Sequence, residues 1–264
     1  MKFGIFIRSV GERTENLCLQ SCLSSNIDRE HIHIIKNFIP ATKAYERMFH
    51  LANQFRYDYY LGIDADIILK NDWYEILSQT ISKIHNDDYF VFSFYIIDKF
   101  LGRIDRGNHF YFGKYTHKAL EVLNANTCNT LKPESYLVNF INAKTDVFDE
   151  VIGYHGYEQY YQDIFYRFWL QYKRNHSDQI RIQLFVDKYA NDNDYKVARA
   201  GWNKSKREIV DNILCNRLKI KKISPNHDQK KYFEKYWKKI VSNEKPPNTK
   251  SYFVFLEERQ LFYE

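Results

Sequence analysis

Glycine, proline and long apolar runs are scarce in this chain, and each shortage excludes a class of protein. The 264 residues include nine Gly and five Pro, too few for collagen-like or low-complexity tracts, so we expect the whole chain to fold. No run of about 18 apolar residues occurs, which argues against a membrane-spanning helix. The apolar N-terminal stretch is short and is interrupted by Arg8, unlike a signal peptide. These absences predict a globular cytoplasmic protein.

Cysteine is also sparse, and charge is only mildly unbalanced. The four Cys match neither a CxxC zinc pair nor the framework of a disulfide-rich domain. Cys18 and Cys22 recur with Leu17 and Leu23 at helical spacing, so we expect reduced thiols on the buried face of a helix. The net charge of +6 suits an anionic partner such as a sugar nucleotide, an acidic membrane or a nucleic acid, without choosing among them.

Aromatic residues are abundant. The chain has 22 Tyr, 20 Phe and four Trp, together 17% of its residues. We expect more rings than the core needs, with some at the surface, where Tyr and Trp stack on sugar rings and nucleobases. A compositional bias that also enriches Lys, Asn and Ile explains the same numbers without any function.

Strand-like and helix-like patterns alternate over the first hundred residues. Apolar runs at 3–7, 31–38, 57–63 and 89–97 predict strands, and the helical patterns between them include 41–54. This order predicts an α/β fold with a Rossmann-like, mostly parallel sheet flanked by helices and largely complete by residue 100. Such sheets bind ligands at the carboxyl ends of their strands.

The segment Asp64-Ala65-Asp66 directly follows the third predicted strand. Alternation along a strand sends both carboxylates to one face, where they can reach the same hard cation and leave positions for a diphosphate. Such an ion neutralises charge that develops on a leaving nucleotide diphosphate. Because a carboxylate pair that closes a buried strand is costly to desolvate, a metal site is favoured over capping aspartates in a solvated loop.

Two segments carry a resemblance to a known family. Residues 57–69 read Tyr-Asp-Tyr-Tyr-Leu-Gly-Ile-Asp-Ala-Asp-Ile-Ile-Leu, which resembles the metal-site strand of GT-A-fold glycosyltransferases, near the family 2-like enzymes of bacterial surface polysaccharides. Residues 5–14, Ile-Phe-Ile-Arg-Ser-Val-Gly-Glu-Arg-Thr, are similar to the first strand and nucleotide-binding loop of these enzymes. The likeness covers residues 1 to about 100 and is looser beyond.

The resemblance implies a metal-dependent transferase that moves a sugar from a nucleotide-sugar donor, a UDP-sugar being favoured, to a hydroxyl of a polysaccharide or glycolipid. It implies that Asp64 and Asp66 bind Mn²⁺ or Mg²⁺. The nucleotide-sugar pocket would include Arg8, Ser9, Arg13, Lys43 and Asp64. Lys43 is equally consistent with a surface charge, and either arginine with a salt bridge.

Residues 151–165 contain further site-like side chains. GT-A enzymes often take a third metal ligand from the C-terminal half, and neutral imidazole suits such a site, so His155 is expected to be that ligand. An inverting transferase needs a carboxylate to accept the proton of the acceptor hydroxyl. Glu158 is the predicted base and Asp163 the reserve, since on one helix they point about 140° apart. A solvated acidic face, or a retaining mechanism without this base, is the alternative.

Residues 228–241 predict a basic amphipathic helix, with Tyr232, Phe233, Tyr236 and Trp237 on one face. Such a helix rests on an anionic membrane, which would suit a lipid-linked acceptor, or else packs its aromatic stripe on the domain. A nucleic-acid partner is not expected, since no binding signature surrounds it. The expected location is cytoplasmic, with a peripheral position at the inner face of the membrane as an option.

These predictions divide the chain into three parts. Residues 1–100 form the nucleotide-sugar-binding α/β half, 101–204 supply acceptor-side loops and a long aromatic helix of the same domain, and 205–264 form a basic helical C-terminal extension. Two other functions remain open. One is a non-catalytic nucleotide-sugar-binding or scaffold subunit. The other is a Mg²⁺-dependent phosphotransferase of the HAD type, which would place its Asp pair after the first strand and use the first Asp as nucleophile.

Overall fold

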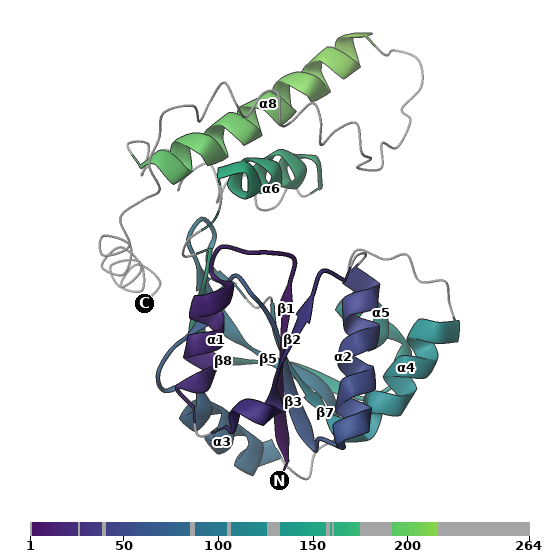
Figure 1. Cartoon of the computed structure of the whole chain (residues 1–264). Helices are drawn as coiled ribbons and strands as arrows, with labels where there is room; N and C mark the ends of the chain where they lie inside the picture. Colours follow the sequence, from purple (N-terminus) through teal and green to yellow (C-terminus); the bar gives the residue numbers. More distant parts are fainter. Residues whose placement is uncertain are drawn as a thin grey trace. The chain divides into compact units, whose positions relative to one another are not determined.

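The computed structural model describes residues 2–25, 27–38, 41–84, 88–104, 107–125, 133–156, 159, 161–174 and 192–215. The described residues fall into two compact units, one within 1–157 and the other within 158–262. The first unit contains the sheet, and the described residues of the second form two helices (Figure 1).

An eight-stranded sheet forms the centre of the first unit, with the strand order β2-β1-β3-β7-β5-β8-β4 and β6 beside β5. The strands are β1 (Phe3–Ser9), β2 (Ile32–Lys36), β3 (Tyr59–Asp64), β4 (Ile67–Leu69), β5 (Tyr89–Asp98), β6 (Gly102–Ile104), β7 (Asn108–Phe112) and β8 (Lys144–His155). Strands β1, β2, β3, β5 and β8 run in one direction, and β4, β6 and β7 run in the other. The predicted α/β fold with a mostly parallel sheet is confirmed.

Helices flank this sheet. They are α1 (Glu15–Leu23), α2 (Ala41–Phe55), α3 (Trp73–Ile84), α4 (Thr116–Ala125) and α5 (Pro133–Phe140), with short 3₁₀ turns η1 (Arg29–His31) and η2 (Gly113–Tyr115). Figure 1 shows α1 and α3 on one side of the sheet and α2, α4 and α5 on the other. The predicted helix at 41–54 is confirmed as α2, and α1 buries Cys18 and Cys22 as free thiols, as its spacing predicts.

Aromatic side chains fill the core between the sheet and α2. Five of these rings are fully buried, those of Phe6, Phe49, Tyr60, Phe90 and Tyr111. They form edge-to-face, stacked and tilted pairs. Burial of a ring of this size contributes about 1.5–3 kcal/mol, so the rings account for much of the stability of this layer. More of the aromatic residues therefore lie in the core than we expected from the composition.

The segment 101–150 differs from the sequence-based expectation of loops. Its described residues contain β6, β7, α4, α5 and most of β8. Strand β7 lies between β3 and β5 in the middle of the sheet, so the prediction that the sheet is largely complete by residue 100 is wrong. The strand is only five residues long, and its position depends on long-range pairing that no local pattern encodes.

The second unit pairs α6 (Tyr161–Arg174) with α8 (Asn193–Cys215). The sequence pattern predicts a long aromatic helix at 154–175 and a short helix at 205–216. Both differ in extent from the observed helices, because residues up to His155 belong to β8 and because α8 begins twelve residues earlier than predicted. The rings of Tyr172 and Trp202 meet at 4.7 Å. The basic helix predicted at 228–241 lies outside the described residues, as does 252–256, whose apolar sequence is strand-like. None of the helices in the described ranges has the length and apolarity needed to cross a membrane.

Gly201 lets α8 approach α6 closely, which generates a testable prediction. A Cβ at this position would lie 2.4 Å from the carbonyl oxygen of Phe165. In an open helix Gly→Ala stabilises by roughly 1 kcal/mol, but here Gly201→Ala should destabilise by about 1–3 kcal/mol because backbone must shift. Urea unfolding measures the change. The exposed Asn203→Ala is the matched control, and a stabilising effect of Gly201→Ala would contradict the close approach.

Candidate functional site

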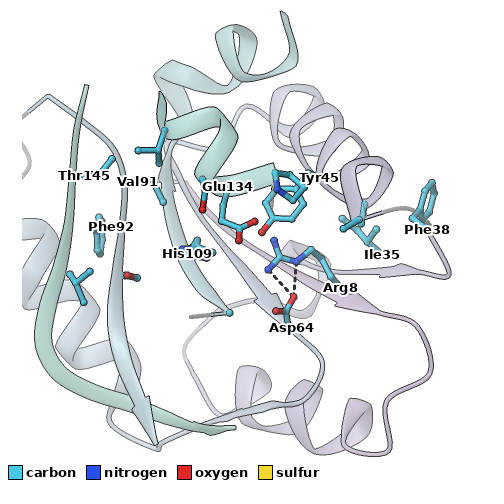
Figure 2. A pocket seen from close by; sticks show the side chains of 18 of the residues that line it. Arg8, Ile35, Phe38, Tyr45, Asp64, Val91, Phe92, His109, Glu134 and Thr145 are labelled. Atoms are coloured by element: carbon cyan, nitrogen blue, oxygen red, sulfur yellow. Dashed lines mark hydrogen bonds and ion pairs between the residues drawn. The ribbon is translucent and has the colours of Figure 1, made fainter. Parts of the chain in front are cut away.

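Parallel pairing of β1 and β3 places Arg8 directly beside Asp64 at the carboxyl ends of both strands. The Nε and Nη2 atoms of Arg8 lie 2.9 Å and 2.8 Å from Oδ1 of Asp64, as Figure 2 shows. The backbone reinforces this contact, because the amide of Ala65 donates to the carbonyl oxygen of Arg8 at 2.9 Å. The register of the two strands therefore determines the position of this ion pair.

The guanidinium of Arg8 is buried and stacked. Its side chain is 8% exposed, and it lies 4.3 Å from the ring centroid of Tyr45 on α2. Burial opposes the charged form, but Asp64 and smaller contributions from groups that include Glu134 outweigh it and hold the pKa of Arg8 above its ordinary value. Within the described structure, Nη1 is buried and has no hydrogen-bond partner. Such a donor is costly to leave unpaired.

A cavity of about 940 Å³ opens beside this ion pair, a size typical of a cofactor or small-molecule site. Its apolar walls come from four elements or their neighbouring loops and include Ile35, Phe38, Tyr45, Val91, Phe92 and Val138. Its charged lining consists of Arg8 and the four carboxylates of Glu12, Asp64, Glu134 and Asp146. Figure 2 shows Glu134 pointing from α5 toward Arg8. Because carboxylates outnumber cations, an anionic ligand would need to bring or share a cation.

The loop after β1 is held by its own side chains. The Ser9 hydroxyl lies within hydrogen-bond distance of both Glu12, at 2.9 Å, and Glu15. The Nζ atom of Lys36 donates to Glu15 at 2.7 Å. Gly11 has a φ of +98°, a left-handed conformation that other residues rarely adopt. These contacts hold the loop at the rim of the cavity, where Ser9 and Glu12 line it.

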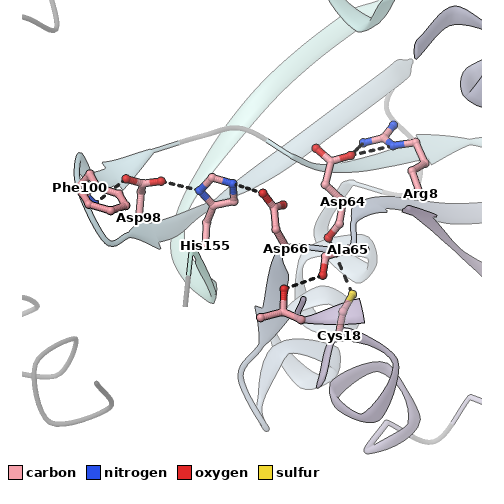
Figure 3. Close-up of polar contacts among 9 residues, drawn as sticks. Arg8, Cys18, Asp64, Ala65, Asp66, Asp98, Phe100 and His155 are labelled. Carbon is pink, nitrogen blue, oxygen red and sulfur yellow. Dashed lines mark hydrogen bonds and ion pairs between the residues drawn. The ribbon is translucent and has the colours of Figure 1, made fainter. Parts of the chain in front are cut away.

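Asp66 faces a different partner from Asp64. Strand β4 pairs with β8 so that Ile67 lies opposite His155, and the amide of Gly156 donates to the carbonyl oxygen of Asp66 at 3.2 Å. Nε2 of His155 then lies 2.8 Å from Oδ2 of Asp66, as Figure 3 shows. The side chains are 17% and 20% exposed. The turn after β3 thus directs one carboxylate to Arg8 and the other to His155.

A third carboxylate, that of Asp98, completes a chain through His155. Asp98 is 0% exposed, and its Oδ2 accepts a hydrogen bond from Nδ1 of His155. Its Oδ1 accepts from the amides of Phe100 and Leu101 at 2.8 Å and 2.7 Å. Burial of His155 disfavours its charge, but Asp66 and then Asp98 outweigh burial and raise the pKa of His155 to about 10. The two carboxylates therefore favour the protonated imidazole.

The chemistry of this donor set fits a divalent metal. A carboxylate oxygen and an imidazole nitrogen already point at one another, and both are good ligands for Mn²⁺. A cation between them would take the place of the Nε2 proton. Asp64 stands apart from this pair, because Arg8 engages its Oδ1. A Cβ on Gly107 would lie 3.2 Å from its Oδ2, so the glycine leaves space beside that oxygen.

A separate group of potential ligands lies on η1. In the described part of the chain, ligating atoms of Asp28, Glu30 and His31 come within 4.8 Å of one another, and the two acidic residues are exposed. None of the three lines the cavity. Exposed carboxylates of this kind are common without a metal, and we assign no site to them.

The structure brings together some of the sequence-predicted site residues. Arg8, Ser9 and Asp64 line the cavity, and Asp66 contacts His155. These positions agree with the predicted nucleotide and metal roles, which stay predictions. The pairing of Asp64 with Arg8 is one that sequence reasoning treated only as an alternative.

Other predicted residues lie elsewhere. Lys43 is 58% exposed and forms an ion pair with Glu46 at 2.7 Å, and neither it nor the half-buried Arg13 lines the cavity. Asp163 is exposed on α6 of the second unit. Glu158 lies outside the described residues. The proposed roles of these residues stay predictions.

Sequence reasoning missed three side chains that the structure adds to the site. Asp98 ends the apolar run of β5 in the same way that Asp64 ends β3, so the rule that identified Asp64 could have found it. Tyr45 lies in the apolar stripe of α2 and is read from sequence as a core residue. Glu134 follows Pro133 in a segment without periodicity, where no local signal distinguishes it.

No protein-family model matches the chain, and no curated protein matches it. Solved structures similar to it include a glycosyltransferase involved in glycosylation of the major capsid of PBCV-1, with 11% identity, a TM-score of 0.40 and coverage of 59% of this chain and 93% of that one. Another is CMP:2-keto-3-deoxy-manno-octonic acid synthetase complexed with CTP, with 9% identity, a TM-score of 0.41 and coverage of 58% and 91%.

A third similar structure is S. aureus TarS 1–349 in complex with UDP-GlcNAc, with 11% identity, a TM-score of 0.37 and coverage of 86% of this chain and 97% of that one. Identities and TM-scores at this level are too low to assign a function. Any functional conclusion must therefore come from the geometry of this chain.

The Glu15 contacts predict a pH-dependent contribution to stability. Hydrogen bonds from Lys36 and then Ser9 lower the pKa of Glu15, so the folded state holds this proton less tightly than the unfolded state. The contribution should be complete above about pH 4.3 and lost as pH falls through the lower folded pKa. Denaturation of Glu15→Gln should show a loss of up to about 1 kcal/mol at pH 7 that shrinks progressively as the pH is lowered below about 4.3. Lys36→Gln should show the same trend, and a loss that stays equal from pH 7 into this acidic range would contradict it.

Proposed function

We propose that this chain is a metal-dependent glycosyltransferase that moves a sugar from a nucleotide-diphosphate sugar to a hydroxyl of a polysaccharide or glycolipid. One observation carries the proposal. At the carboxyl edge of the sheet, the Asp66–His155 pair stands two residues along the chain from Asp64, which lines a cavity large enough for a nucleotide. Ligands of mostly parallel sheets bind at this edge.

The charge of the cavity supports metal dependence. Arg8 is accompanied by four carboxylates in the described lining, an arrangement that would repel a bare diphosphate. A divalent cation held by Asp66 and His155, with Asp64 close by in sequence, would offset this repulsion. Mn²⁺ or Mg²⁺ at this position would supply charge neutralisation for the departing nucleotide diphosphate.

Different residues of the cavity would contact different parts of the nucleotide-sugar. Arg8, which lines the cavity and is held by Asp64 and by the ring of Tyr45, would direct its guanidinium charge toward the nucleotide. The apolar walls at Ile35 and Val91 would exclude water from one face of the base or sugar. A rigid, buried guanidinium of this kind binds without a large loss of side-chain entropy.

The transfer step itself needs one proton acceptor. The acceptor hydroxyl oxygen would bond to the anomeric carbon as the bond from that carbon to the diphosphate oxygen breaks, and the hydroxyl proton would pass to a carboxylate. Glu158 remains the predicted base and Asp163 the reserve. A UDP-sugar remains the favoured donor, and residues 228–241 remain the candidate contact with an anionic membrane.

The arrangement argues against the phosphotransferase alternative. In that class the first Asp of the pair is a nucleophile, whereas Oδ1 of Asp64 here accepts a hydrogen bond from Nε of Arg8 and forms an ion pair with its Nη2. The pair also follows the third strand in chain order. A non-catalytic binding subunit would use the same cavity but would not release nucleotide from a sugar donor. Turnover distinguishes that alternative from the proposal.

Removal of the Asp66 carboxylate tests the proposed function. In Asp66→Asn, release of UDP from a panel of UDP-sugars in the presence of Mn²⁺ should fall at least about tenfold, because the cation loses a charged ligand. The exposed Asp72→Asn is the matched control and should keep full activity. Circular dichroism checks that both variants fold. Undiminished Mn²⁺-dependent release by Asp66→Asn would refute the role of this carboxylate.

A further inference from the structure

We propose that Asp98 is a positioning residue that fixes the imidazole of His155 so that Nε2 is the atom presented to a divalent cation. The inference rests on the proposed function, because it concerns the same metal. It adds a residue that neither the Asp-x-Asp segment nor the resemblance points to, and it assigns a defined tautomer to His155.

The backbone already holds the two residues side by side. Strands β5 and β8 are parallel neighbours, and Asp98 and His155 are register partners at the carboxyl ends of both. The amide of Lys99 donates to the carbonyl oxygen of His155 at 3.1 Å. Two strand ends joined in this way give the side chains little freedom to move apart.

The two carboxylate oxygens of Asp98 contact different groups. Oδ1 accepts from the amides of Phe100 and Leu101 at 2.8 Å and 2.7 Å, which holds the turn that follows β5. Oδ2 contacts Nδ1 of His155. A carboxylate only accepts hydrogen bonds, so Nδ1 must carry a proton. In a neutral imidazole Nε2 is then the unprotonated nitrogen, and it lies 2.8 Å from Oδ2 of Asp66.

The turn alone does not explain a carboxylate at this position. Asp98 is 0% exposed, and burial of a charge is costly unless it is paired. An Asn side chain could accept the same two amide hydrogen bonds and form the same turn without a charge. Asn, however, has only one side-chain oxygen. If that oxygen accepts hydrogen bonds from the two amides, Asn has no acceptor left for Nδ1 of His155.

This difference makes Asp98→Asn a selective test. With its oxygen on the amides of Phe100 and Leu101, the substituted side chain presents an NH₂ group to His155. That group donates to Nδ1, so Nδ1 must become the unprotonated nitrogen and the proton moves to Nε2. The turn is kept, but the nitrogen that faces Asp66 is blocked for metal coordination.

The experiment measures binding of Mn²⁺ alone to the full chain by calorimetry, and ¹⁴N coupling to bound Mn²⁺ by pulsed electron paramagnetic resonance. Wild type should bind Mn²⁺ with a histidine ¹⁴N coupling. Asp98→Asn should weaken Mn²⁺ binding about 10–100-fold and lose that coupling, as His155→Gln should, while its circular dichroism spectrum in EDTA remains that of the folded protein. The exposed Asp72→Asn should match wild type in both measurements.

The outcomes separate this inference from the proposed function. If wild type binds Mn²⁺ with ¹⁴N coupling and Asp98→Asn keeps both affinity and coupling, Asp98 has only a structural role and the inference fails alone. If wild type does not bind Mn²⁺, the metal of the proposed function fails as well. Should Asp98→Asn not fold, ¹⁵N correlation spectra of Mg²⁺-loaded wild type decide. A proton on Nδ1 of His155 supports the inference, and a proton on Nε2 overturns it.

Discussion

The ion pair between Arg8 and Asp64 joins the carboxyl ends of two adjacent parallel strands, and the rest of the site depends on it. Because the guanidinium is buried against Tyr45, loss of its carboxylate would leave a costly unpaired charge. The pair therefore holds β3 in position where the chain turns toward Asp66. It also leaves one Arg8 donor, Nη1, buried without a hydrogen-bond partner in the described part of the chain.

Beyond that ion pair, the two aspartates have different surroundings. Asp64 contacts Arg8 at the cavity, while Asp66 contacts His155, whose other nitrogen contacts the buried Asp98. The intervening Ala65 is 0% exposed, and its backbone is held by Arg8 and by the hydroxyl of Thr14 at 2.9 Å. This turn thus separates a carboxylate that lines the cavity from one that contacts His155, an arrangement that the proposed function would use to hold a cation beside a diphosphate.

Local signals predicted the elements that carry this arrangement. The apolar runs that became β1 and β3, and the helical spacing of Cys18 and Cys22, are short-range patterns and were read correctly. The central position of β7 depends on pairing with strands far away in sequence, and the partner of Asp66 depends on the register between β4 and β8. Neither is encoded in a local window. Asp98 was missed although it ends a strand like Asp64, since the sequence does not show which strand ends become neighbours.

The most direct test of this account is titration of the wild-type chain with UDP, GDP and CDP, each with and without Mn²⁺. The carboxylate-rich cavity should bind one of these nucleotides only when Mn²⁺ is present, because the cation must offset the repulsion between the diphosphate and the four carboxylates. Nucleotide binding of equal strength without Mn²⁺, or no binding to any of the three with Mn²⁺ present, would contradict a metal-dependent nucleotide-sugar site.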